Sequence, residues 1–275
     1  MPPLLATARD RLTGQRAKTA GHPTIGTGFY FLSELSGSAQ RATSVTLRTK
    51  AGRVPITRSA TGSGDVRVQV PIDFKIHMPV ALPSVKALQG ALSEADYAAA
   101  DLASPLADSA LPVVSIVRGM SWALLEMASE DALARLQPYP SPPQLPAGHL
   151  GEWQGESPAM VYAFFMESAP EGAEQTARLR ARMFYGAGCE DAATGSAAAA
   201  LCSWLAVTRG ASRPGSGGRP DGECRSRRFE VLQGSEMGRP SKISVEVDVG
   251  AVGQQVVAVA LEGKAVQTME GTLVI

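Results

Sequence analysis

The spacing of apolar residues changes along the chain and predicts more strands than helices. Residues 66–70 alternate between apolar and polar positions, which is the period of a half-buried strand. Residues 44–48 and 54–57 also have strand composition, and they flank Gly52, a residue type favoured in tight turns. We therefore expect a hairpin followed by another antiparallel strand, in a meander rather than in β-α-β units.

The rest of the chain adds strand patterns and short helices. Residues 84–107 are rich in Ala with Asp and Ser between them, which predicts short helices and the boundary between two halves, residues 1–110 and 111–275. Ser129 is a favourable N-cap for a short helix ending at Leu136, ahead of a proline-rich loop at 138–146. Further strands are expected at residues 111–117, 122–127, 160–166, 182–184, 229–232, 243–249, 255–261 and 271–275.

Two apolar helices stand out from this strand-rich background. The first is expected near residues 23–36, because Pro23 suits the first helical position and Ile25, Phe29 and Leu32 then share a face. The second is expected near residues 192–208, where Ala, Leu and Trp leave little polar surface. A helix that is apolar all round is usually buried, so each is a candidate for the centre of one half.

Composition and charge exclude several classes of protein. Lys and Arg number 26 and so do Asp and Glu, so the chain lacks the basic excess of a nucleic-acid-binding protein. No run approaches the ~20 apolar residues that cross a bilayer, and no signal-peptide core follows the basic start. We expect a cytoplasmic protein, with organelle targeting as the alternative. Residues 209–228, rich in Gly, Pro, Ser and Arg, predict an exposed loop.

The starts of the two helices share a local pattern. When Gly26 is placed over Gly195, a titratable residue stands four positions before each glycine, His22 in one and Asp191 in the other. Helix N-termini carry unpaired N–H groups and a positive dipole end, so two facing ends would hold a carboxylate. The alternatives are that Asp191 is only a helix cap and that His22 is a partly buried histidine without a catalytic role.

Three segments carry a more specific signal, because they follow one another in a fixed order: residues 20–27 (AGHPTIGT), 189–197 (CEDAATGSA) and 233–241 (QGSEMGRPS). Together they resemble the phenazine-biosynthesis PhzF-like family. The resemblance runs from residue 19 to residue 275, with the 209–228 loop as an insertion.

The resemblance implies an α+β protein with the diaminopimelate-epimerase-like fold. In that fold two similar halves each wrap a mostly antiparallel, barrel-like sheet around a central helix, and the active site lies between them. The implied activity is an isomerisation of a small carboxylate-bearing substrate, in the best-understood branch a dihydro-hydroxyanthranilate, by proton transfer without a metal or organic cofactor. A homodimer is also implied.

The resemblance also assigns site residues. The catalytic pair would be His22 and Asp191, and the substrate would be bound by four further residues: Gly21, Thr194, Gly195 and Ser196. The family's main acid/base, a glutamate about thirty residues before the Gly-His-Pro motif, has no counterpart because the chain begins too late. We therefore expect a truncated or degenerate member with an incomplete first half and impaired activity.

Two other functions remain open on sequence grounds. A catalytically silent binding or dimerising protein would keep the cleft without the base. A thiol racemase of the same fold would use Cys189, but such enzymes need one thiol from each half, and Cys189, Cys202 and Cys224 all lie in the second half. The spacing of the three cysteines supports neither a disulfide framework nor a metal site.

Overall fold

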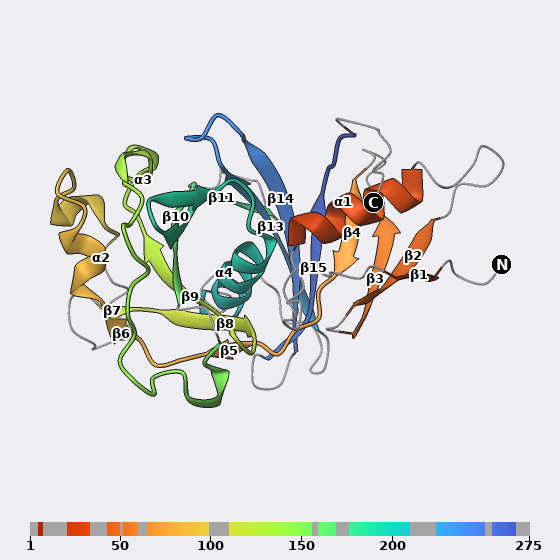
Figure 1. The fold of residues 1–275 in the computed structure, drawn as a ribbon, viewed down its shortest axis with the longest axis horizontal. Coiled ribbons are helices and arrows are strands. Elements are labelled where there is room, and N and C mark those ends of the chain that lie inside the picture. Colours follow the sequence, from red (N-terminus) through yellow and green to blue (C-terminus); the bar gives the residue numbers. More distant parts are fainter. Residues whose placement is uncertain are drawn as a thin grey trace, which may run out of the picture. The chain divides into compact units, whose positions relative to one another are not determined.

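The computed structural model describes residues 5–7, 21–33, 43–49, 52–59, 65–98, 110–155, 159–168, 176–209, 224–250 and 255–267. They belong to two compact units (Figure 1). Unit 1 contains the chain up to Pro71 and again from Ala260, and unit 2 contains Ile72–Val259. The division into sequence halves at residue 110 stays a prediction, since these units divide the chain by its contacts and not by its order.

Unit 1 is a small sheet with one helix. The strands follow the order β1-β2-β3-β4-β15, where only the last part of β15 belongs to this unit. The predicted meander is confirmed, because β2 pairs antiparallel with β3 and β3 with β4, whereas β1 pairs parallel with β2. The elements are β1 (Leu5–Thr7), α1 (Gly21–Ser33), β2 (Ser44–Thr49), β3 (Gly52–Arg58), β4 (Val66–Gln69) and β15 (Val256–Gly263).

Helix α1 packs against β2, β3 and β4 through a narrow face. Thr24, Gly28 and Leu32 are the buried residues of this face and follow one another at helical spacing. A Cβ atom at Gly28 would lie 2.7 Å from Cγ2 of Ile56, so only glycine allows this close approach. The apolar sequence predicted a helix buried on all sides. Tyr30 is 47% exposed, so α1 is instead buried on one face.

Unit 2 is a larger sheet around a second helix. Its strands follow the order β14-β13-β11-β10-β9-β8-β5, with β12 beside β11 and with β6 and β7 in a separate pair. The elements are β5 (Lys75–Ile76), β6 (Val80–Ala81), α2 (Pro83–Ala87), the 3₁₀ helix η1 (Glu94–Asp96), β7 (Ala110–Leu111), β8 (Val113–Val117), β9 (Met120–Glu126), α3 (Glu130–Arg135), the 3₁₀ helix η2 (Gly151–Trp153), β10 (Met160–Met166), β11 (Thr176–Gly186), β12 (Cys189–Asp191), α4 (Gly195–Thr208), β13 (Arg225–Gln233) and β14 (Ser241–Val249).

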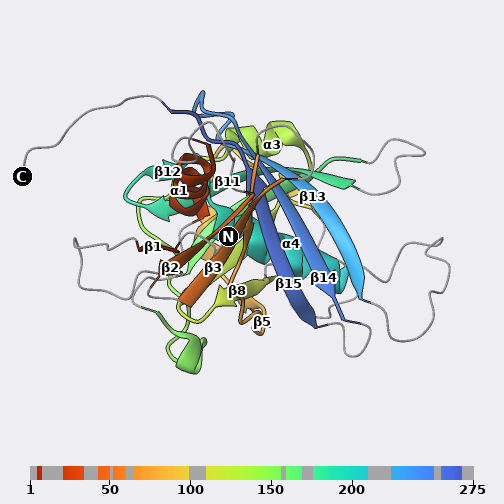
Figure 2. The same ribbon diagram turned by 90° about the vertical axis from the view of Figure 1, so that its right-hand side faces the viewer.

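Helix α4 is the centre of unit 2. It contacts β8, β9, β13 and β14, and Figure 1 shows these strands curving around it. Figure 2 shows β13 and β14 side by side, with α4 next to β14. Ala197, Ala198, Ala199 and Ala200 are all fully buried. Consecutive helical residues point about 100° apart, so this part of α4 is buried on all sides, as its apolar sequence predicted. Small side chains let the strands approach the helix backbone, which explains why an alanine run occupies this position.

The prediction of a mixed α+β protein with more strands than helices is confirmed. Two parallel pairs in unit 2 depart from the expected antiparallel pattern: β9 with β10, and β11 with β13. A parallel pair needs a long crossover, and the connections that contain α3 and α4 supply these crossovers.

Two predicted boundaries are corrected by the structure. Helix α4 begins at Gly195 and not at residue 192. Strand β13 begins at Arg225, so the last residues of the expected loop at 209–228 are part of a strand. Residues 210–223, 34–36 and 271–275 lie outside the described residues.

Candidate functional site

A tight hairpin brings Asp191 to the start of α4. Strand β12 pairs antiparallel with β11, and Asp191 lies opposite Met183. The turn between these strands contains Gly186, Ala187 and Gly188, all with positive φ, which reverses the chain within a few residues. Asp191 is therefore held at the end of a strand, four residues before the first residue of α4.

The carboxylate of Asp191 is bound locally by the residues that lead into the helix. Its Oδ2 accepts a hydrogen bond of 2.7 Å from the hydroxyl of Thr194, and its Oδ1 accepts one of 3.4 Å from the N–H of Ala193. Thr194, and not Asp191, is the N-cap residue of α4. Asp191 is therefore not the N-cap residue of α4, because its partners precede the first helical turn, and its catalytic role stays a prediction.

Helix α4 begins without a side-chain cap. Thr194 makes no capping hydrogen bond, since its hydroxyl is directed to Asp191. An N-cap side chain ordinarily binds the N–H of the second or third helical residue, here Ser196 or Ala197. Thr194 leaves these N–H groups without that partner, at the positive end of the helix dipole. The arrangement can accept an anion beside the Asp191 carboxylate.

The amide of Gln233 closes the loop that carries Asp191 and Thr194. Its Nε2 donates to the carbonyl of Asp191 at 2.8 Å and to Oγ1 of Thr194 at 3.0 Å. Its Oε1 accepts from the N–H of Thr194 at 3.2 Å and from the hydroxyl of Tyr162 at 3.0 Å. Burial raises the pKa of Tyr162 well above its ordinary value, so this hydroxyl remains a donor.

Gly234 allows the backbone after Gln233 to lie against the same loop. Its φ is +81°, and a Cβ atom would lie 2.6 Å from the carbonyl oxygen of Arg239 and 2.8 Å from that of Ala192. Only glycine avoids both the strained backbone and this clash. The segment 233–239 is thus a close-fitting support for the residues between β12 and α4.

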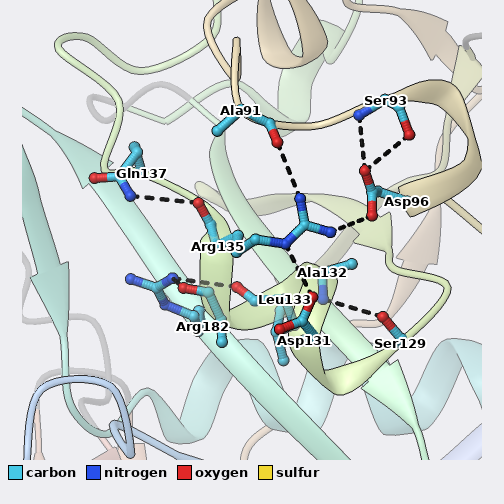
Figure 3. Close-up of polar contacts among 11 residues, drawn as sticks. Ala91, Ser93, Asp96, Ser129, Asp131, Ala132, Leu133, Arg135, Gln137 and Arg182 are labelled. Atoms are coloured by element: carbon cyan, nitrogen blue, oxygen red, sulfur yellow. Dashed lines mark hydrogen bonds and ion pairs between the residues drawn. The ribbon is translucent and has the colours of Figure 1, made fainter.

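A buried ion pair fixes the residue beside Asp191. Arg182 holds Glu190 with two hydrogen bonds, Nε to Oε1 at 2.9 Å and Nη2 to Oε2 at 2.7 Å, and both side chains are less than 10% exposed. Nη1 of Arg182 also donates to three carbonyl oxygens at the end of α3, those of Leu133, Ala134 and Leu136. Figure 3 shows the contact with Leu133. The guanidinium therefore joins β12 to α3.

Helix α3 is anchored in turn on its outer side. Ser129 caps it by accepting from the N–H of Ala132 at 3.0 Å, as predicted. Arg135 then bonds to Asp131, to the carbonyl of Ala91 at 2.9 Å and to Asp96 in η1 (Figure 3). These contacts fix the position of α3, and therefore of the carbonyl groups that bind Arg182.

The other predicted site residues lie in unit 1. Gly21 and His22 are the first two described residues of α1, and the His22 side chain is exposed. Gly26 lies inside α1, whereas Gly195 is the first residue of α4. The two helix starts are therefore not superimposable residue for residue. Because His22 and Asp191 belong to different units, their expected meeting stays a prediction.

The sequence did not identify Arg182, Glu190, Tyr162 or Gln233 as functional residues. Arg182 sits among alternating arginines of β11, where a solvated strand is the ordinary interpretation. Gln233 is the first residue of the third family-like segment, and this position was the sequence signal that could have marked it as functional. Among the described residues, no group of three or more His, Cys, Asp or Glu side chains could hold a metal ion. The helices of the described residues include none long and apolar enough to span a membrane.

Comparisons with known proteins agree with the motifs. The family model described as phenazine biosynthesis-like protein (PhzC-PhzF) matches residues 15–271. A PhzF-family phenazine biosynthesis protein from Bacillus anthracis superposes with a TM-score of 0.61 at 20% identity, over 94% of this chain and 76% of that chain. A PhzC/PhzF phenazine biosynthesis protein from Clostridium difficile gives a TM-score of 0.52 at 14% identity, over 94% and 74%. The search of curated proteins gives no significant match.

Proposed function

This chain belongs to the phenazine biosynthesis-like PhzC-PhzF family, and we propose that it is an isomerase that moves a proton between carbon atoms of a small carboxylate-bearing substrate without a cofactor. The observation that carries the proposal is the local structure at Asp191. A carboxylate with a fixed orientation lies four residues before an uncapped helix N-terminus. Such an arrangement supplies a proton acceptor and an anion-binding group together.

Within this proposal each site residue has a role. The N–H groups at the start of α4, with Gly195 and Ser196, bind the carboxylate of the substrate, and Asp191 accepts or returns the proton. His22 and Gly21 contribute from the other half of a diaminopimelate-epimerase-like fold, across the active site. An imidazole side chain can both accept and donate a proton, which suits it to general acid–base catalysis.

The family resemblance also supports two wider parts of the proposal. The enzyme would act in the cytoplasm, and it would be a homodimer. A native mass measurement on the purified full chain tests the second part directly. A mass of twice the chain is expected, and a monomer at micromolar concentration would contradict it.

Turnover is the decisive test of the function. The purified chain is incubated with a dihydro-hydroxyanthranilate, and isomerisation is followed by ultraviolet absorbance. We expect turnover by the wild type and a decrease of about 10²- to 10⁴-fold in His22→Ala and in Asp191→Asn, the usual loss when a general acid or base is removed. Thr208→Val is the control, because the Thr208 hydroxyl donates to the carbonyl of Trp204 at the far end of α4.

The result that would contradict the proposal is binding without turnover. If the wild type binds the compound but forms no product, the chain is a silent binding or dimerising protein. Calorimetry on the same samples measures this binding. Equal turnover in the wild type and in both variants would show that another part of the chain is responsible.

A further inference from the structure

We propose that Thr194 and Gln233 are positioning residues for Asp191, because a directed series of hydrogen bonds runs from Tyr162 through Gln233 and Thr194 to the Asp191 carboxylate. The inference rests on the proposed function, in which Asp191 touches the substrate. It assigns a role to the buried amide of Gln233, and it changes the role of Thr194. The Thr194 hydroxyl orients the acid and does not bind substrate.

The orientation of the Gln233 amide has one solution. Its oxygen faces the N–H of Thr194, which can only donate, and its nitrogen faces the carbonyl of Asp191, which can only accept. In a flipped amide, the nitrogen of Gln233 would face the N–H of Thr194, and its oxygen would face the carbonyl oxygen of Asp191. Gln233 is fully buried, so no water could relieve that conflict. Nε2 must therefore donate to Thr194.

The orientation of the Thr194 hydroxyl follows from that of Gln233. Oγ1 of Thr194 accepts a hydrogen bond of 3.0 Å from Nε2 of Gln233, and this bond uses one lone pair of the hydroxyl oxygen. Its single proton then points to Oδ2 of Asp191, 2.7 Å away. Asp191 consequently faces a donor that has been turned toward it, and this hydrogen bond holds the carboxylate in one rotamer.

Tyr162 secures the far end of the series. Its side chain is fully buried on β10, and its hydroxyl donates to Oε1 of Gln233 at 3.0 Å. The same oxygen also accepts from the N–H of Thr194, so Tyr162 is one of two donors that hold it. We expect its removal to weaken the series without breaking it.

The arrangement also explains why α4 begins without a cap. A Thr194 hydroxyl that donates to Asp191 and accepts from Gln233 is no longer available to the N–H groups of Ser196 and Ala197. The same rotation that orients the acid therefore leaves the helix N-terminus available to a substrate carboxylate. Thr194 couples the two requirements of the proposed site.

The test uses hydroxyl variants of the full chain. Thr194→Val keeps the side-chain volume and removes the proton donor, Thr194→Ser restores it, and Tyr162→Phe removes only the far donor. Thr208→Val makes the same chemical change at the opposite end of α4, where the hydroxyl bonds to the Trp204 carbonyl. Thermal unfolding of each variant shows whether the fold is retained.

Two readouts distinguish positioning from a structural role. With a dihydro-hydroxyanthranilate as substrate, kcat should fall about 10- to 100-fold in Thr194→Val while KM changes less than about threefold, recover in Thr194→Ser, and fall less than about threefold in Tyr162→Phe. In nuclear magnetic resonance spectra, Thr194→Val should shift one side-chain amide proton of Gln233 and the carboxyl carbon of Asp191. Thr208→Val should shift neither.

Several outcomes would overturn the inference. It fails if Thr194→Val keeps the wild-type kcat, or if Thr194→Ser loses as much kcat as Thr194→Val. It also fails if the resonances of Gln233 and Asp191 do not respond to the loss of the hydroxyl. If the wild type has no turnover, the isomerase proposal fails, and the resonance shifts alone decide whether the hydrogen-bonded series exists.

Discussion

Arg182 and Glu190 form a two-bond ion pair in the interior of unit 2, with N to O distances of 2.9 and 2.7 Å, and Glu190 is the residue immediately before Asp191. The pair is almost completely removed from solvent. Nη1 of Arg182 donates to three carbonyl groups at the end of α3. The position of Asp191 on β12 is therefore fixed by its neighbour. The Glu190 side chain cannot move without losing its partner Arg182 and leaving a buried charge unpaired.

Removal of this pair should be costly. Arg182→Met leaves Glu190 buried without its partner, which typically destabilises a protein by about 3–5 kcal/mol. Urea unfolding of the purified chain measures the change. Arg178→Met is the matched control on the same strand, because Arg178 is exposed and lies 3.7 Å from Glu230, and such pairs contribute about 0–1 kcal/mol. Equal losses in the two variants would contradict the role given to Arg182.

The close approach of Gly234 to the carbonyl groups of Ala192 and Arg239 gives a second prediction. Gly234→Ala must adopt φ near +81° and also place its Cβ against the carbonyl oxygens of Ala192 and Arg239. Gly238→Ala has a similar φ of +67° but nothing within 4 Å of the new atom. We expect about 1–2 kcal/mol of destabilisation for Gly238→Ala from the backbone alone and about 1–3 kcal/mol more for Gly234→Ala.

Crystal structures and unfolding curves of the two variants would check this difference. The residues between β12 and α4 should move in Gly234→Ala and remain in place in Gly238→Ala. An undisturbed Asp191 loop in Gly234→Ala would show that the segment 233–239 does not support it.

His77 makes stability depend on pH. Its ring is buried, bonds through Nε2 to the hydroxyl of Ser115 at 2.8 Å and lies edge-on to Trp153. Burial first, and then the positive charges of Lys75 and His149, lower the pKa of His77 from 6.5 to about 4. The folded state therefore favours the neutral ring, and this contribution is complete above about pH 6.5 and is lost as the pH falls toward 4.

The variant His77→Gln separates this effect from general acid denaturation. Wild-type stability should decrease between pH 7 and pH 4 more steeply than that of the variant, measured as the urea midpoint at each pH. The exposed ion pair between Asp73 and Arg118 is present in both proteins, so it does not distinguish them. Parallel pH profiles for the two proteins would show that His77 is not responsible.

Local patterns predicted those parts of the molecule that depend on neighbouring residues. The hairpin β2–β3, the Ser129 cap of α3 and the buried alanine run of α4 follow from turn, cap and apolar signals within a few residues. The parallel pairing of β9 with β10 was missed, because alternation along a strand does not reveal the direction of its partner.

The supports of Asp191 could not be found in the same way. Gln233 is 39 residues from Thr194, and a glutamine at the end of a strand has no pattern that marks it as buried. Arg182 resembles its exposed neighbour Arg178 in sequence, and only the packing of α3 and β12 distinguishes them. Long-range hydrogen bonds of this kind require the fold.

Proton transfer at carbon is the central claim, and solvent isotope incorporation tests it most directly. The wild-type chain is incubated with a dihydro-hydroxyanthranilate in D₂O, and the products are followed by proton magnetic resonance. We predict an isomerised product that carries deuterium at a ring carbon, formed at least about 10²-fold more slowly by Asp191→Asn. Recovery of the compound unchanged and undeuterated from the wild type, or equal rates in both proteins, would contradict the account.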